Sequence, residues 1–249
     1  MWTVLIIVFV FFVYFGMPYI YRKCAKIALK SKAVTSKSLV LTFDDGPGDR
    51  LTPAVMDLLN QFNIKASFFL LGRNIAGREN VVRQIASRGH EICSHGFDHL
   101  NYVKVLPWRA LNDIKKGWRE IDTALGITRG KYPFRPPYGK LNIVCLVYLL
   151  LKKVPIIYWT DDSGDTWKTE PDSDRIANII ENSRGIVALY HDFDRSTQKK
   201  DPWIMESIRL ALEMAKEKNM NIVTIPELSS VREGAKKRII VVDKVLDEG

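Results

Sequence analysis

Three of the four histidines in this chain lie in two short stretches whose residue types can carry chemistry. His95 and His99 are four positions apart, a spacing that lets both imidazoles bind one ion, and His191 lies much further along. Adjacent carboxylates, Asp44 and Asp45, follow an apolar run. Two imidazoles and one carboxylate make a three-ligand site with an open position for water, and the second carboxylate is free to act as a base. The pattern predicts metal-assisted hydrolysis.

These polar residues come directly after segments that read as strands. Past residue 37, apolar runs alternate with helical patterns, and seven runs read as strands: Ser38–Phe43, Ala66–Leu71, Glu91–Ser94, Tyr132–Arg135, Pro155–Thr160, Gly185–Tyr190 and Asn221–Ile225. The alternation predicts a parallel sheet closed, or nearly closed, as a distorted (β/α)7 barrel. Barrel enzymes gather their active sites at the C-terminal ends of strands. We therefore expect the polar strand ends to share one rim.

An uncharged segment from Trp2 to Ile20 precedes the barrel. It is about long enough to cross a hydrocarbon core, and aromatic residues stand at both of its ends. A basic start and a small-residue cleavage site, which mark a signal peptide, are both missing from it. The sequence predicts a retained single-pass anchor in the cell membrane.

The chain divides on this basis into four parts. We predict a transmembrane anchor over 1–21, a basic juxtamembrane linker over 22–37, a catalytic domain over 38–228 and a polar tail over 229–249. Within the tail, an apolar segment over 239–246 could add a strand or dock elsewhere.

The formal net charge of +9 is concentrated next to the anchor. Residues 22–37 hold six basic side chains and no acidic one, which leaves 31 basic against 28 acidic residues in the rest of the chain. A cluster in this position predicts contact with anionic lipid and not with nucleic acid. Because no basic residue precedes the span, the positive-inside rule favours a cytoplasmic catalytic domain.

Three cysteines are too few and too scattered for a disulfide framework, so we expect free thiols. Cys93, two residues before His95, is a further candidate ligand, although a free cysteine is more often a small buried side chain. His90, at the start of a predicted strand, is expected to be structural.

Five short motifs in this chain carry a family resemblance. They are Thr42-Phe43-Asp44-Asp45-Gly46, the pair His95 and His99, Arg135-Pro136-Pro137-Tyr138-Gly139, a looser segment from Trp159 to Asp165, and Leu189-Tyr190-His191. In this order and at strand ends, they resemble the NodB-type polysaccharide deacetylases, also called carbohydrate esterase family four. The resemblance extends over roughly residues 39–225.

The resemblance implies a role for each residue on the water-activating side of the site. Asp45, His95 and His99 would bind a divalent ion, which the resemblance implies is zinc, although a His-His-Asp set suits several ions. Asp44 would be the general base that takes a proton from the attacking water. Arg135 would hold Asp44 in place through charge-assisted hydrogen bonds.

The resemblance also implies how the leaving group and the acetyl group are handled. His191 would protonate the leaving amine, and Asp165 would orient His191 and keep it cationic. The backbone N–H of Tyr138 would help to stabilise the tetrahedral oxyanion. Leu189 and Trp167 would form a small apolar pocket for the acetyl methyl group.

Two positions depart from the family pattern. Gly96 replaces the usual serine or threonine after the first metal histidine, where the hydroxyl typically braces the loop. Trp167 stands two residues after Asp165 where the family has it one residue after. The second departure leaves Asp162 open as the partner of His191.

The resemblance implies an N-deacetylase of amino sugars whose substrate depends on the side of the membrane. A domain outside the cell, the habit of many family members, suits a wall glycan. A cytoplasmic domain suits a lipid-linked or nucleotide-linked sugar. Two alternatives stay open: a catalytically silent glycan-binding protein on the same fold, and a deacylase of another amide such as a formylated amino sugar.

Overall fold

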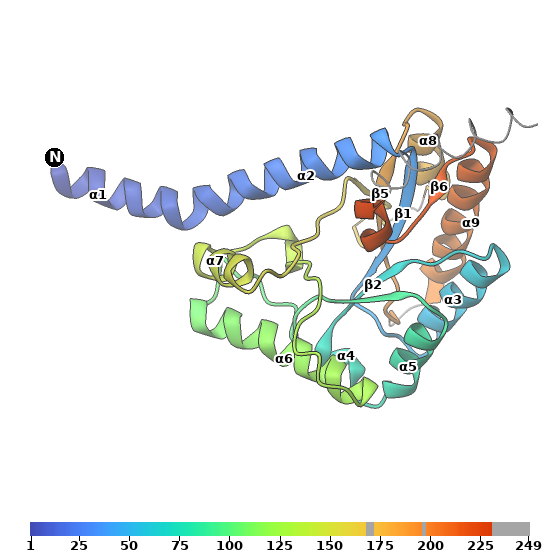
Figure 1. Cartoon of the computed structure of the whole chain (residues 1–249), viewed down its shortest axis with the longest axis horizontal. Helices are drawn as coiled ribbons and strands as arrows, with labels where there is room; N and C mark the ends of the chain where they lie inside the picture. The colour runs from blue at the N-terminus through green and yellow to red at the C-terminus, as the bar shows by residue number, and fades with distance from the viewer. Residues whose placement is uncertain (168–171, 196–197, 231–249) are drawn as a thin grey trace, which may run out of the picture.

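A parallel sheet forms the centre of the domain in the computed structural model, which describes residues 1–167, 172–195 and 198–230 (Figure 1). Its strands are β1 (Ser38–Asp44), β2 (Ser67–Leu70), β3 (Glu91–Ser94), β4 (Asp161–Asp162), β5 (Ile186–His191) and β6 (Asn221–Ile222). They are ordered β3-β2-β1-β5-β4, with β6 also paired to β1. Each pairing is parallel.

Two isolated bridges close this sheet into a barrel. Phe134 pairs with Ser94 at the end of β3 and with Ile156 on its other side. The chain then runs from Ile156 into β4, which pairs with β5. The predicted strands over 132–135 and 155–160 are therefore present only as single bridges. Pro133 and Pro155 lack an N–H group, so these two segments cannot form continuous ladders.

The last strand is also shorter than predicted, because β1 has only two edges. One edge pairs with β5 from Leu39 to Asp44. The other pairs with β6 at Ser38 and Leu39 and with β2 from Thr42 onward. Asn221–Ile222 thus fills the corner where β1 and β2 diverge.

Helices surround the barrel (Figure 1). Successive side chains of each strand point alternately toward these helices and into the barrel. The surrounding helices are α3 (Leu51–Gln61), α4 (Gly72–Ile75), α5 (Glu79–Ser87), α6 (Pro107–Leu125), α7 (Ile143–Leu151), α8 (Arg175–Glu181) and α9 (Asp201–Glu217). In β1, Leu41 and Phe43 belong to the main apolar core. The two-residue period then turns Thr42 and Asp44 into the barrel. Asp44 occupies the top of this interior row.

The N-terminal helix is continuous from Trp2 to Thr35 through α1 (Trp2–Phe11), a π-helical turn η1 (Phe12–Gly16) and α2 (Met17–Thr35). Its first part extends away from the barrel and is apolar and exposed (Figure 1). The helix is long and apolar enough to cross a membrane. It is the single candidate span that the described residues contain.

The segment over 22–37, predicted as a linker, is helical through Thr35 and packs on the barrel. Ala33 is fully buried, Lys30 Nζ lies 3.4 Å from Asp161 Oδ2, and Lys26 Nζ is 5.1 Å from the ring centre of Trp159. Basic side chains that turn toward the protein are less available to anionic lipid. The predicted tail lies outside the described residues from 231 onward.

Candidate active site

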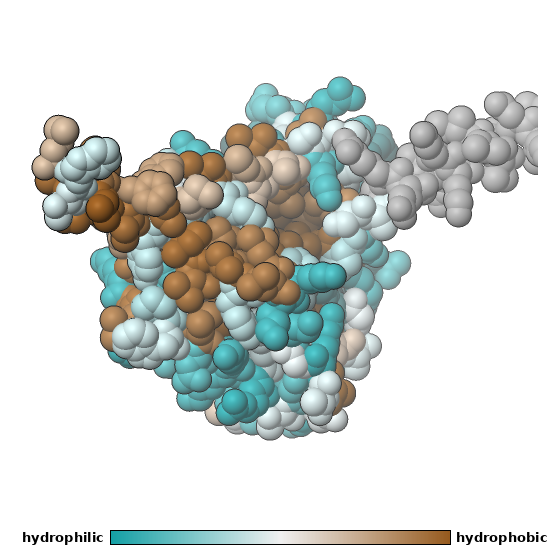
Figure 2. Space-filling model, turned by 60° about the vertical axis from the view of Figure 1, so that its left-hand side comes forward, coloured by the Kyte–Doolittle hydropathy of each residue, from teal (hydrophilic) through white to brown (hydrophobic). Residues whose placement is uncertain are grey.

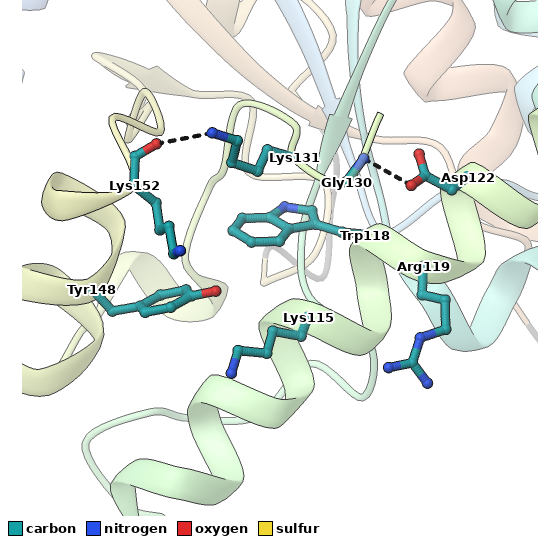
Figure 3. A pocket seen from close by; sticks show the side chains of 8 residues that line it. All are labelled: Lys115, Trp118, Arg119, Asp122, Gly130, Lys131, Tyr148 and Lys152. Atoms are coloured by element: carbon teal, nitrogen blue, oxygen red, sulfur yellow. Dashed lines mark hydrogen bonds between the residues drawn. The ribbon is translucent and has the colours of Figure 1, made fainter. Parts of the chain in front are cut away.

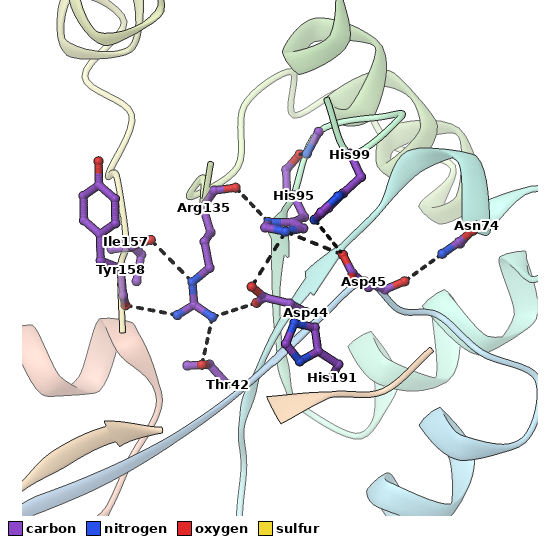
Figure 4. Close-up of polar contacts among 12 residues, drawn as sticks. Thr42, Asp44, Asp45, Asn74, His95, His99, Arg135, Ile157, Tyr158 and His191 are labelled. Carbon is purple, nitrogen blue, oxygen red and sulfur yellow. Dashed lines mark hydrogen bonds and ion pairs between the residues drawn. The ribbon is translucent and has the colours of Figure 1, made fainter. Parts of the chain in front are cut away.

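The three predicted metal ligands meet at the C-terminal ends of β1 and β3 (Figure 4). Their ligand atoms all lie within 4.8 Å of one another. Asp45 Oδ1 is 3.6 Å from His95 Nε2 and 3.5 Å from His99 Nε2. Two ligands that are each about 2.1 Å from one tetrahedral ion lie about 3.4 Å apart, so these separations suit a shared ion.

The chemistry of the ligands also fits a cation. Asp45 Oδ1 is buried and has no hydrogen-bond partner within the described part of the chain, which is costly for a charged oxygen unless a cation is bound. His95 Nδ1 lies 2.8 Å from the Arg135 carbonyl, which it reaches as a donor, leaving Nε2 to face the other ligands. Burial lowers the pKa of His95 to about 3, so its ring is neutral, as a metal ligand requires.

Asp44 lies beside this ligand set and is held from behind by Arg135. Arg135 Nη1 donates to Asp44 Oδ1 over 2.6 Å and to Thr42 Oγ1 over 2.9 Å, and Nη2 donates to the Tyr158 carbonyl (Figure 4). The other oxygen, Asp44 Oδ2, is 3.7 Å from His95 Nε2. Burial raises the pKa of Asp44, and the charge and hydrogen bond of Arg135 oppose that shift. One oxygen is thus fixed and the other faces the ligand set.

His191 and Asp165 form a second buried pair. The ring Nδ1 of His191 lies 2.7 Å from Asp165 Oδ1, and the backbone N–H of His191 donates to Asp165 Oδ2 over 2.8 Å. Burial would lower the pKa of His191, but the charge and hydrogen bond of Asp165 raise it to about 9. The ring is therefore cationic at neutral pH. Asp162, the alternative partner, accepts instead from the N–H of Gly164.

The loop that carries His99 is braced by α6, a contact that the sequence did not indicate. The Asp113 carboxylate accepts hydrogen bonds from the backbone N–H groups of Phe97 and Asp98 and from the hydroxyl of Tyr102. Gly96 has a φ of +85°, and a Cβ there would lie 2.5 Å from both Asp113 Oδ2 and Tyr102 Oη. Asp113 thus braces the loop where the family uses a hydroxyl, and its position requires glycine at 96.

We expect Gly96→Ser to destabilise the protein by about 3 kcal/mol, because the new side chain adds a clash to left-handed strain. Gly130 is a matched control, since its φ is +73° and a Cβ there meets nothing within 4 Å. Gly130→Ser should cost about 1 kcal/mol, the strain alone. Denaturant unfolding of the full-length protein in detergent measures both losses, and equal losses would show that the clash is absent.

Two further aspartates, Asp192 and Asp194, accept hydrogen bonds from the segment that follows β1 and were not identified from the sequence. Asp192 Oδ2 accepts from the Thr52 hydroxyl over 2.6 Å, and its side chain packs so tightly on Gly46 that a Cβ there would lie 2.5 Å from Oδ1. Asp194 accepts the backbone N–H groups of Asp49, Arg50 and Leu51 at the start of α3. Their position just after the His191 motif was the only signal in the sequence.

The remaining predicted residues lie around the same rim. Leu189 is buried on the interior row of β5, two residues before His191. The ring of Tyr138 packs edge-on against His99 with centroids 4.6 Å apart. Trp167 is 61% exposed, and the Arg175 guanidinium lies 5.9 Å from its ring centre. The structure thus places Leu189 and Tyr138 next to site residues and leaves Trp167 toward solvent.

Three residues of this rim have left-handed backbones: Asp45 (φ 70°), His99 (φ 57°) and Tyr138 (φ 57°). A non-glycine residue in that region costs on the order of 1–3 kcal/mol, and such strain gathers at functional sites. In Asp45 the turn is fixed by Asn74 Nδ2, which donates to its carbonyl over 2.7 Å.

His90 and Cys93 lie outside the ligand set. His90 Nδ1 accepts the Ala66 N–H, and burial, with the nearby charges of Lys65 and Arg88, lowers its pKa to about 4. Cys93 is fully buried, and burial raises the pKa of its thiol well above the usual value. Both side chains are structural in this geometry.

A separate pocket of about 350 Å³ lies between α6 and α7 (Figure 3). Trp118 and Tyr148 stack in it with ring centroids 6.4 Å apart, and several lysines, including Lys131 and Lys152, surround them. None of its lining residues belongs to the five motifs.

The rim combines three side chains that could bind a cation, a carboxylate held by arginine and a histidine–carboxylate pair, and metal-assisted hydrolases use sites of this class. A family model described as polysaccharide deacetylase matches residues 31–149. A peptidoglycan-N-acetylglucosamine deacetylase of Bacillus cereus is 34% identical over 76% of this chain and 67% of its own length. The chain belongs to the polysaccharide deacetylase family.

Two further comparisons agree with that membership. The peptidoglycan-N-acetylglucosamine deacetylase PgdA of Listeria monocytogenes is 32% identical over 82% of this chain, which spans about two fifths of the length of that protein. A crystal structure of a peptidoglycan N-acetylglucosamine deacetylase bound to an N-oxidanyl-benzamide ligand superposes with a TM-score of 0.70. It is 31% identical and covers 78% of this chain and 89% of its own.

Proposed function

We propose that this protein is a metal-dependent hydrolase that removes N-acetyl groups from amino sugars. The observation that carries the proposal is the convergence, at one rim, of the Asp45-His95-His99 set with the Asp44–Arg135 and His191–Asp165 pairs. Amide hydrolysis needs an activated water, a stabilised oxyanion and a proton for a poor leaving group. Each need is matched by one part of this rim.

Asp45, His95 and His99 would hold the ion, and zinc suits this donor set, as do several other divalent ions. When bound, such an ion lowers the pKa of a coordinated water and polarises the amide carbonyl.

Asp44 acts as the general base in this proposal. Its free oxygen faces the ligand set, and the bond from Arg135 keeps the carboxylate from rotating away. Burial makes it a stronger base than an exposed aspartate, since it raises the pKa. The water that Asp44 deprotonates then attacks the acetyl carbonyl carbon.

His191 acts as the general acid that protonates the sugar nitrogen as the C–N bond breaks. Its pKa of about 9 keeps a proton available at neutral pH, and Asp165 holds the ring through Nδ1 so that Nε2 carries the transferred proton. The Tyr138 N–H stabilises the oxyanion, and the buried Leu189 takes the acetyl methyl group. Trp167, which was expected to share that pocket, lies toward solvent in this geometry.

The relatives favour N-acetylglucosamine residues as substrate, because those of Bacillus cereus and Listeria monocytogenes are named for acting on them in peptidoglycan. The N-terminal helix, as a single-pass membrane anchor, would keep the domain close to a bilayer. A wall glycan outside the cell and a lipid-linked sugar inside it are both compatible with such an anchor. The positive-inside rule favours a cytoplasmic domain, whereas the habit of many family members favours a domain outside the cell. Reporter fusions at the C-terminus distinguish the two sides.

An amine-release assay with metal analysis tests the proposed function. The purified full-length protein should carry about one divalent ion per chain and release glucosamine amines from N-acetylated chitooligosaccharides. Amine release from an N-formyl analogue alone would favour the formylated-sugar alternative. Sugar binding without amine release, at full metal content, would favour the silent glycan-binding protein.

We expect Asp165→Asn to move the high-pH limb of kcat downward by about two pH units. Loss of the carboxylate removes the largest of the effects that favour the imidazolium, so burial is opposed only by the weaker charges of Asp45 and Asp44, and the pKa of His191 falls from about 9 toward its usual value. The proton donor is then lost at lower pH. Asp162→Asn is the matched control from the same segment and should leave the limb in place. A shift in that variant instead would make Asp162 the partner.

A further inference from the structure

The N-terminal helix meets the barrel at a depth that belongs to the membrane. A hydrocarbon core about 30 Å thick needs about 20 helical residues, which runs from Trp2 to the region of Tyr21. The loop after Tyr138 and the helix α7 already contact the helix between Phe12 and Arg22. This side of the rim therefore lies between the lipid headgroups, at the level of Arg22, and the adjoining part of the hydrocarbon core, at the level of Phe15.

The exposed face of α7 agrees with this placement. Val144, Val147, Leu150 and Leu151 share one side of the helix and are between 38 and 77% exposed. Figure 2 shows apolar surface that extends from the N-terminal helix onto the domain. A patch of this kind next to a membrane-spanning helix has a bilayer to cover it.

A pocket of about 190 Å³ opens between the N-terminal helix and the rim. Its apolar wall is formed by Phe15, Pro18, Tyr19, Val103 and Leu141. Two cations, Arg22 and Lys140, complete it, and no carboxylate of the described chain forms an ion pair with either one. The pocket thus has an apolar wall on one side and, beside it, two positive charges without an ion-pair partner among the described residues.

The pocket shares a wall with the active site. Gly139 lines it and directly follows Tyr138, whose ring contacts the ligand His99. The Arg22 guanidinium lies against Gly139, where a Cβ would be 3.3 Å from Cζ. A ligand could therefore place a charged group at Arg22 and a sugar at the metal ligands.

We propose, building on the proposed deacetylase function, that this pocket binds the phosphate groups and the first part of the lipid chain of a lipid-linked amino sugar, which is the substrate. Arg22 and Lys140 supply charge-assisted hydrogen bonds to the phosphate oxygens. The apolar wall takes the chain at the depth where a membrane lipid presents it. A soluble wall polymer carries neither group and would leave the pocket unused.

The test compares two N-acetylated substrates with full-length protein in nanodiscs of uncharged lipid. One is N-acetylglucosaminyl diphospho-polyprenol in the disc, and the other is tetra-N-acetylchitotetraose in solution. The double variant Arg22→Gln, Lys140→Gln should lose about tenfold or more in kcat/KM on the first and less than about twofold on the second. Lys131→Gln, Lys152→Gln removes two cations from the α6–α7 pocket and should change neither rate.

Several results would overturn the proposal. They are an unchanged rate of the Arg22, Lys140 variant on the lipid-linked sugar, an equal loss on both substrates, or an equal loss in the control variant. Wild-type turnover of the soluble sugar without turnover of the lipid-linked one would also overturn it.

A binding measurement tests the proposed role of the pocket independently of catalysis. If no substrate is deacetylated, the proposed function is wrong, but the binding measurement still tests the pocket. Sugar-free polyprenyl diphosphate should bind the wild-type protein by native mass spectrometry and bind the Arg22, Lys140 variant at least tenfold more weakly. UDP-N-acetylglucosamine carries a diphosphate without a lipid and should bind far more weakly than the lipid. Equal binding of the two would show phosphate recognition alone and would refute the role of the lipid wall.

Discussion

Replacing Asp44 with asparagine should lower kcat by about 10³-fold while leaving the metal bound. A positioned general base contributes typically 10²- to 10⁴-fold, and asparagine cannot take a proton. The ion should stay, because the three proposed ligands do not include Asp44. Amine release on an N-acetylated chitooligosaccharide and elemental analysis after dialysis give the two readouts.

The same substitution leaves the buried Arg135 without its carboxylate, so some loss of stability is expected as well. Full metal content in the variant shows that the fold survived. Asp57→Asn serves as control and should keep the full rate, because Asp57 is an exposed residue of α3 that forms an ion pair with Arg88, away from the site. If Asp44→Asn turned over at a near-normal rate, the assignment of the base would be wrong.

The second large effect is expected for His95→Gln, which should lose both the ion and the activity. His95 is buried at the centre of the ligand set, and its Nε2 lies within 4 Å of oxygens from both aspartates. Without it, Asp45 and His99 provide only two of the three ligands that catalytic zinc sites use. Metal affinity should fall by at least about 100-fold, measured by competition with a chelator.

His90→Gln is the matched histidine variant for that measurement. His90 is buried and five residues from His95, but its ring bonds the Ala66 backbone and packs on Phe68, outside the ligand set. Its loss should reduce stability and leave metal affinity within about twofold of wild type. An equal drop in affinity in both variants would mean that loop unfolding, and not ligand loss, removes the ion.

The strands and helices that position the site could largely be predicted from local patterns. The apolar run over Ser38–Phe43 identified β1 and placed Asp44 directly after it, and the helical patterns between the apolar runs identified surrounding helices such as α6. The segments around Phe134 and Ile156 were predicted as full strands and are single bridges. Their prolines were visible in the sequence. How many strand hydrogen bonds remain beside a proline, however, depends on which segments lie next to it in the fold.

The linker was harder to predict for a different reason. The basic residues of 22–37 suggested contact with solvent and lipid, because charged side chains usually lie on the protein surface. Lys30 and Lys26 instead lie against Asp161 and Trp159, residues more than 130 positions away. Such long-range pairing leaves no local trace.

By itself the sequence determined which side chains could do chemistry: two imidazoles four apart, adjacent carboxylates, and further polar residues after strands, since those are properties of residue type and short spacing. Only the tertiary structure decided how they are paired. It set His191 on Asp165 and not Asp162, fixed one oxygen of Asp44 on Arg135, and braced the loop that carries His99 with Asp113. It also set the N-terminal helix beside the rim. Each of these contacts joins segments that are separated in the sequence and meet only in the folded chain, so no local pattern could have indicated them.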